Sequence, residues 1–89
     1  MADSSQQPVI TLVVSPAELG KAVRAARTAM GLSMREAAER ARVGKRFVLE
    51  LEQGKPSARL DKVLVLMAAV NLLALVVPLD EAMAALGPK

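Results

Sequence analysis

Residues 31–54 read GLSMREAAERARVGKRFVLELEQG, a pattern that predicts two short helices joined by a tight turn. Ser33 is a favourable N-cap residue, and Glu36 stands three positions later, where its carboxylate completes a capping box. Gly44 interrupts the helical pattern and can cap the second helix, which Gly54 then ends. Two helices of about eight or nine residues around a turn that contains Gly have the layout of a helix-turn-helix.

The segment before this stretch predicts a short strand followed by a longer helix. Residues 9–14, VITLVV, are mostly β-branched and are bounded by prolines on both sides, which favours a strand. Ser15 and Pro16 then provide an N-cap and a first helical residue, and Glu18 stands at the capping-box position. We expect this helix to end at Gly31, because glycine readily adopts the left-handed conformation found after a helix C-terminus.

The segment after it, residues 62–79, reads KVLVLMAAVNLLALVVPL and is almost entirely apolar. Ser57 is expected to cap a fourth helix, and Asn71 to end it in a left-handed turn. Residues 72–77 then predict a second strand, which Pro78 stops. A transmembrane helix needs roughly 17–25 apolar residues without a break. This interrupted run therefore predicts no membrane insertion.

The predicted fourth helix is apolar on all sides, which indicates that both of its faces are covered. One face is expected to enter the core, with Leu60, Val63, Leu64 and Met67. The other face and the strand after it predict a homodimer interface formed by Val65, Leu66, Ala69, Leu73, Leu75 and Val77. In this dimer the C-terminal strand would pair with its mate or with the strand at residues 9–14, which would cover their exposed edges.

Positive charge is concentrated in the middle of the chain. Residues 20–62 contain eleven Lys or Arg against five Asp or Glu, whereas the whole chain has a net charge of +3. A cationic block of this kind suits a polyanionic partner, most simply a nucleic-acid backbone. An ordinary solvated helical surface is the alternative interpretation.

The stretch GLSMREAAERARVGKRFVLELEQGKPSARLDKVL, at the centre of residues 19–77, resembles the helix-turn-helix of the phage-repressor superfamily, often called the XRE family. The words SPAEL, KRFVLELEQGKP and RLDKVL are more narrowly similar to HipB-type antitoxins. The resemblance implies a DNA-binding repressor that regulates its own operon. The narrower similarity implies an antitoxin of a HipA–HipB-like toxin–antitoxin module, whose partner would be a HipA-like kinase.

The second helix of the motif is expected to read DNA sequence. Its first turn points into the major groove, so the exposed side chains there, and those one turn later, reach base edges. These are Lys45, Arg46 and Glu50. Lys and Arg donate to guanine and a carboxylate accepts from cytosine, which predicts G·C pairs in the operator. Nonspecific phosphate binding by the two cations, and an i,i+4 pair between Arg46 and Glu50, are the alternatives.

Other side chains are expected to hold the DNA backbone and so to set the position of the protein on the duplex. These predicted phosphate contacts are Ser33, Arg35, Arg42, Phe47, Lys55 and Arg59. Simple solvation of any of the cations, and core packing of Phe47, are the alternatives.

Arg27 and Glu52 match, by the same resemblance, a pair that links the first and third helices of the family. We expect a partly buried ion pair with a structural role.

Length and composition predict one small domain. Of the 89 residues 53% are hydrophobic and only Phe47 is aromatic, which suits helices packed closely on small aliphatic side chains. The predicted fold is all-α, a four- to five-helix repressor-like helix-turn-helix domain with short terminal β-strands at a dimer interface. We expect a flexible tail at residues 1–8, the DNA-binding and dimerisation domain at 9–78, and a C-terminal tail at 79–89.

The chain has no Cys and no His, which removes disulfides, thiolate and imidazole metal ligands, and the usual nucleophile and general base. We therefore predict no catalytic residues, no metal and no cofactor, and a protein that is not an enzyme. The N-terminus MADSSQQP has neither the basic nor the apolar region of a secretory signal. A cytoplasmic, nucleoid-associated location is expected.

Two functions follow from these patterns. The first is a dimeric, sequence-specific repressor that binds a palindromic operator in double-stranded DNA, with antitoxin activity as its family-derived extension. The second is a protein-interaction module that restrains a partner protein and binds DNA only weakly.

Overall fold

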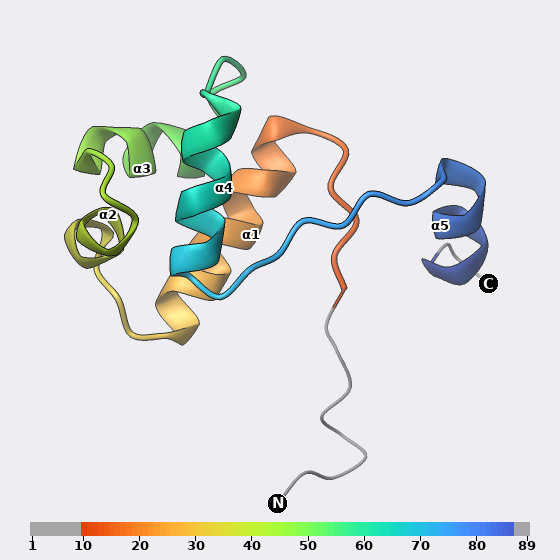
Figure 1. Cartoon of the computed structure of the whole chain (residues 1–89), viewed down its shortest axis with the longest axis horizontal. Helices are drawn as coiled ribbons and strands as arrows, with labels where there is room; N and C mark the ends of the chain where they lie inside the picture. The colour runs from red at the N-terminus through yellow and green to blue at the C-terminus, as the bar shows by residue number, and fades with distance from the viewer. Residues whose placement is uncertain (1–9, 87–89) are drawn as a thin grey trace, which may run out of the picture.

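The computed structural model describes residues 10–86, and this part of the chain contains five helices and no strand (Figure 1). The helices are α1 (Pro16–Ala29), α2 (Met34–Ala41), α3 (Lys45–Glu52), α4 (Leu60–Ala69) and α5 (Leu79–Leu86). The first four form one body, in which α3 packs against α1 and α2, and α4 packs against α2. The predicted all-α class is therefore confirmed.

The first two helices begin at the N-caps that the sequence predicts. The hydroxyl of Ser33 accepts a hydrogen bond from the Glu36 N–H at 3.0 Å, and the Glu36 carboxylate accepts one from the Ser33 N–H at 2.8 Å. At α1 the Ser15 hydroxyl accepts from the Glu18 N–H at 3.2 Å, but the Glu18 carboxylate reaches the Val14 N–H instead of its own cap residue. At both helix N-termini these hydrogen bonds satisfy backbone N–H groups that have no partner within the helix.

Each of the first four helices is followed by a residue with a left-handed backbone conformation. These residues are Gly31 (φ 70°), Arg42 (φ 59°), Gly54 (φ 88°) and Asn71 (φ 66°). Each is followed by the hydrogen bonds of a Schellman motif; after α3, for example, the Lys55 N–H donates to the Glu50 carbonyl at 3.0 Å. The predicted breaks at Gly31, Gly54 and Asn71 are thus confirmed. Arg42 is the residue at which a side chain tolerates a conformation that glycine adopts more easily.

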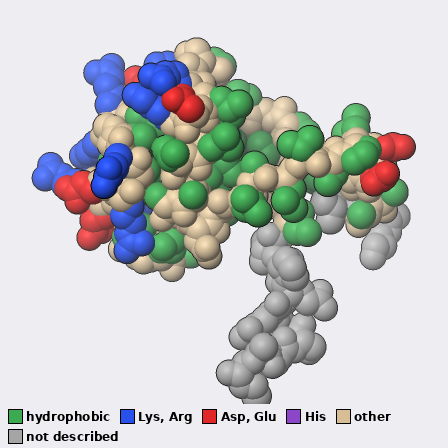
Figure 2. Space-filling model, in the orientation of Figure 1, with side chains coloured by type: hydrophobic (Ala, Val, Ile, Leu, Met, Phe, Trp, Pro, Cys, Tyr) green, Lys and Arg blue, Asp and Glu red, His purple; other side chains and the backbone are tan. Residues whose placement is uncertain are grey.

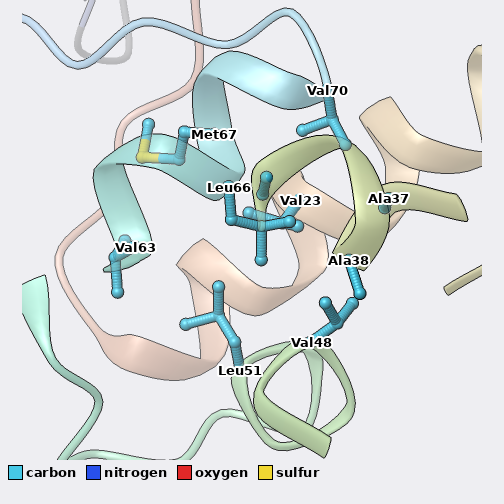
Figure 3. Close-up of a cluster of buried hydrophobic side chains, with 10 residues drawn as sticks. Val23, Ala37, Ala38, Val48, Leu51, Val63, Leu66, Met67 and Val70 are labelled. Carbon is cyan, nitrogen blue, oxygen red and sulfur yellow. The ribbon is translucent and has the colours of Figure 1, made fainter. Parts of the chain in front are cut away.

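The core lies between the first four helices (Figure 3). Leu66 of α4 is fully buried and points toward Val23 of α1 and the small side chains of α2 (Figure 3). Ala37 and Ala38 of α2 are also buried, and their size lets α4 approach closely. These alanines of α2 therefore provide the space that the large side chains of α4 fill.

The orientation of α4 differs from the prediction. Leu66 has 0% exposure, so it belongs to the core of its own chain and not to a dimer interface, whereas Leu60 is 68% exposed. The buried stripe is Val63, Leu66 and Met67 of α4 with Val70 after it, whereas Leu64, also predicted to enter the core, is 46% exposed. The start also differs, because Arg59 rather than Ser57 is the N-cap residue and makes no side-chain cap hydrogen bond. A helix that is apolar all round has no periodicity to indicate which face packs.

The two predicted strands do not form within the single chain. Residues 10–14 and 72–78 are irregular, while Val9 lies outside the described residues. Backbone groups of a strand need a partner strand, and a single hairpin or an isolated segment seldom supplies one. Instead the C-terminal segment leads to α5, which lies apart from the four-helix body (Figure 1). Most of the large apolar side chains of this segment are exposed: Leu73, Leu75, Val76, Val77 and Leu79.

Within residues 10–86, each helix is too short or too polar to cross a lipid bilayer.

Candidate nucleic-acid interface

The helix-turn-helix is formed by α2, the turn at residues 42–44, and α3. The apolar side of α3 is anchored in the core by Val48 and Leu51, which leaves the other side of the helix to face solvent. Lys45 and Arg46 occupy the exposed first turn of α3, and the Arg46 side chain is 87% exposed. The first turn of α3 is the part from which the sequence predicts base contacts.

Lys and Arg side chains gather on one side of the molecule. Figure 2 shows them over the region of α2, α3 and the loop that leads to α4, whereas hydrophobic side chains gather over α4 and the C-terminal segment. On the face seen in Figure 2 the cations and most apolar side chains thus lie over different parts of the surface, and the cationic part suits a polyanionic partner. We refer to the part formed by the first turn of α3 and by residues 53–59 as the cationic face.

Glu50, the third predicted base contact, is engaged by two cations. Its carboxylate accepts hydrogen bonds from Arg46 Nε and from Lys55 Nζ, each at 3.0 Å. The hydrogen bonds from Lys55 and Arg46 hold the pKa of Glu50 below its ordinary value, so this side chain is a carboxylate at neutral pH. The i,i+4 pair with Arg46, considered as an alternative on sequence grounds, is present, and Lys55 joins it.

The predicted phosphate contacts occupy different parts of this surface. Arg35 is exposed in the first turn of α2, Arg42 is exposed in the turn, and Lys55 lies in the loop after α3. Ser33 uses its hydroxyl oxygen to cap α2. Arg59 forms a bidentate pair with Asp61, with both side chains exposed. An exposed pair of this kind is weak and can open toward a phosphate.

Phe47 is half-buried and packs against the core, as the alternative interpretation held. Its ring lies 6.0 Å from the Nζ of Lys62, at the outer limit of a cation–π contact. Both side chains line a shallow recess of about 140 Å³ between α3 and the start of α4. Lys62 was not among the predicted contacts, although its position three residues after Arg59 places it on the same side of α4.

Arg27 and Glu52 form the expected link between α1 and α3. Arg27 Nε and a terminal nitrogen donate to the two carboxylate oxygens of Glu52 at 2.7 and 3.0 Å, and its other terminal nitrogen donates to the Leu32 carbonyl at 2.9 Å. The side chains are only 10% and 3% exposed. The hydrogen bond to Glu52 raises the pKa of Arg27 further, so the guanidinium stays charged, and its hydrogen bonds to Glu52 tie α1 to α3.

Comparison with known proteins agrees with this geometry. Residues 22–83 match the sequence model of a family described as a helix-turn-helix domain, which is more than half of the chain. The chain belongs to this helix-turn-helix family. The helix-turn-helix protein is also 44% identical, over 52 residues, to an uncharacterized HTH-type transcriptional regulator, y4mF, of Sinorhizobium fredii, a match that covers 58% of this chain and 68% of the relative.

The family match confirms the helix-turn-helix prediction at the level of the domain. The apolar run at residues 62–79 falls entirely within the matched region, as most of α4, the segment after it and the first residue of α5.

Proposed function

We propose that this helix-turn-helix protein is a DNA-binding transcriptional regulator that acts as a sequence-specific repressor. The observation that carries the proposal is the pair Lys45 and Arg46, exposed on the first turn of α3 while the opposite side of that helix is locked in the core. The relative described as a transcriptional regulator supports the same function.

In this function α3 enters the major groove and the surrounding cations hold the backbone. Lys45 and Arg46 donate to guanine O6 and N7, each good contact discriminating against the wrong base by roughly 1–3 kcal/mol. Arg35, Arg42 and Lys55, with Arg59, contact phosphates and fix the position of α3. Because counterions are released from each neutralised phosphate, affinity falls steeply as salt rises.

A homodimer completes the proposal. A two-fold dimer would place two recognition helices about 34–36 Å apart and read a palindromic operator. Support comes from the apolar side chains that one chain leaves exposed on α4 and after it, among them Val65, Leu73, Leu75 and Val77. In the dimer the segments at residues 10–14 and 72–77 would gain the strand partners that a single chain does not provide.

The resemblance to HipB-type antitoxins extends the proposal to a partner protein, a HipA-like kinase that the regulator would restrain in the cytoplasm. The separation of α5 from the four-helix body supports a role for the C-terminal segment in binding another protein (Figure 1). The same observation favours the second candidate function, a protein-interaction module with weak DNA binding. Copurification with the product of a neighbouring gene tests the partner directly.

The decisive experiment measures binding to a duplex carrying the DNA upstream of the protein's own gene, by fluorescence anisotropy across a salt titration. Replacing Lys45 and Arg46 together by Ala is expected to abolish preference for this duplex over a scrambled one, because the base contacts are lost. Thermal unfolding should change little, since both side chains are exposed.

The matched control replaces Lys21 and Arg24, two exposed cations of α1 that are not among the proposed contacts. It removes the same charge and should retain the preference, with only a small general loss of affinity. Equal preference in wild type and in the Lys45 and Arg46 variant would disprove recognition by α3 and favour the protein-interaction function.

A further inference from the structure

Glu50 occupies a position that neither base reading nor simple repulsion of DNA explains well. Its carboxylate lies between Arg46 on α3 and Lys55 in the following loop, with a 3.0 Å hydrogen bond to each. The side chain is 29% exposed, whereas that of Arg46 is 87% exposed and that of Lys55 46%. The acid therefore lies beneath the two cations, which project beyond it into solvent.

The backbone also fixes the position of Lys55 relative to Glu50. Gly54 adopts φ 88°, and this left-handed turn brings the Lys55 N–H to the Glu50 carbonyl at 3.0 Å. Lys55 is thus tied to Glu50 twice, once through the main chain and once through the side chains. A long, flexible lysine that would otherwise sample many rotamers is held in one direction, which lowers the entropy lost when it binds a phosphate.

The surroundings indicate what these cations face. Glu50 and Lys55 line the recess between α3 and α4 together with Arg59 and Lys62. Three cations around one shallow recess suit a phosphate oxygen, and a carboxylate pointing freely into it would repel one. Here the carboxylate accepts hydrogen bonds from two cations, and although Asp61 is paired with Arg59, the four cations Arg46, Lys55, Arg59 and Lys62 outnumber the two acids around the recess.

We propose that Glu50 is a positioning residue, a bridge that holds Arg46 toward the groove and Lys55 toward the backbone, and that it does not itself read a base. The inference rests on the proposed DNA binding and deepens it, because it assigns the acid of the recognition helix to backbone positioning. It replaces the predicted contact between Glu50 and cytosine.

The test compares Glu50→Ala with wild type on the upstream duplex, on a scrambled duplex and on single base-pair variants of the bound site. Loss of the bridge is expected to weaken binding to every duplex by roughly two- to fivefold, although a negative charge has been removed. Discrimination should be retained at every base pair except the one that Arg46 reads, where it should decrease because Arg46 is no longer held by Glu50. Glu39→Ala, an exposed acid on α2, removes the same charge away from the bridge and should leave affinity unchanged or raise it.

A double-mutant cycle provides the readout that a purely structural role would not change. Lys55→Ala should weaken binding in the wild-type background but add little in Glu50→Ala, because the lysine is no longer held in place. Tighter binding of Glu50→Ala to all duplexes, a loss of discrimination at a base pair that Arg46→Ala does not affect, or full additivity with Lys55→Ala would each overturn the inference. If wild type itself fails to prefer the upstream duplex, the proposed function fails first, and the inference with it.

Discussion

At the scale of the single residue, the buried carboxylate of Glu52 joins α1 to α3. It receives two hydrogen bonds from Arg27 within a nearly closed environment. Removing one partner of such a pair leaves the other charge buried without a counter-charge. The free-energy cost of this is far larger than the stabilisation that the intact pair provides over well-packed apolar residues.

Glu52→Gln is therefore expected to lower the free energy of unfolding by about 3–5 kcal/mol, as measured by urea denaturation followed by circular dichroism. The double variant Arg27→Met with Glu52→Leu leaves no unpaired charge and should be more stable than Glu52→Gln. If the single and double variants lose equal stability, the stranded charge is not the cause and the pair acts mainly through its packing.

At the scale of the element, α1 crosses α3 at Gly20. A Cβ at this position would lie 2.4 Å from the Leu51 carbonyl oxygen and 2.8 Å from that of Glu52. These are backbone atoms at the end of α3, so they cannot rotate away as a side chain does. The close approach also brings Arg27 and Glu52 within reach of each other, since the same two helices carry them.

Gly20→Ala is expected to destabilise the protein by roughly 1–3 kcal/mol through overpacking, although Ala usually stabilises a helix interior relative to Gly by about 0.5–1 kcal/mol. Thermal and urea unfolding provide the measurement. Gly44→Ala is the matched control, because a Cβ there meets nothing within 4 Å and the backbone is not left-handed; its cost should stay below about 1 kcal/mol. A stabilising Gly20→Ala would contradict the observed crossing.

The start of α2 gives stability a dependence on pH. Hydrogen bonding to the Ser33 N–H, and then to its hydroxyl, lowers the pKa of Glu36 from its ordinary value of 4.5. A group with a lower pKa in the folded state stabilises the fold above the ordinary pKa, and this contribution is lost as the pH falls through the folded value. Unfolding free energy should therefore decrease as the pH is lowered below about 4.5.

Glu36→Gln should reduce this acid dependence without removing it, because Glu50 and Asp61 also have lowered pKa values. Denaturation curves of wild type and variant at neutral and acidic pH measure the difference. An unchanged slope in Glu36→Gln would show that the capping box does not couple protonation to folding.

At the scale of the whole molecule, charge and apolar surface lie in different places (Figure 2). The cationic face is formed by the four-helix body, while the exposed aliphatic side chains follow α4 along the C-terminal segment. Large contiguous apolar surfaces are rare on monomers and mark sites of association. The proposed dimer would use this surface and leave the cationic face available to DNA.

Replacing Leu73 and Leu75 together by Lys is expected to weaken dimerisation by roughly ten-thousandfold or more, since four leucines would be lost from the interface per dimer and each contributes about 1.5–3 kcal/mol when buried. Sedimentation equilibrium at several concentrations measures the effect. Val76→Lys is the control, because alternate residues of an extended segment face opposite sides and Val76 is not among the proposed interface residues. A wild-type chain that is monomeric at micromolar concentration would contradict the dimer.

The sequence predicted those features that neighbouring residues decide. The caps at Ser15 and Ser33 and the breaks at Gly31, Gly54 and Asn71 depend on hydrogen bonds and backbone preferences that act over a few residues. The same local signals predicted the helix-turn-helix, and so the exposure of Lys45 and Arg46. The family membership of the chain followed from that short stretch.

The tertiary structure decided what periodicity and local chemistry leave open. Because α4 is apolar on every side, only the space beside Ala37 and Ala38 determined that Leu66 faces the core, which corrected its predicted place in an interface. Likewise the turn at Gly54 brings Lys55 back to Glu50 and changes the proposed role of that acid. The amino-acid sequence by itself determined the starts of α1, α2 and α3 and the breaks at Gly31, Gly54 and Asn71, since capping is local, but not the start of α4. Only tertiary packing determined which face of α4 is buried, since that depends on residues distant in the chain.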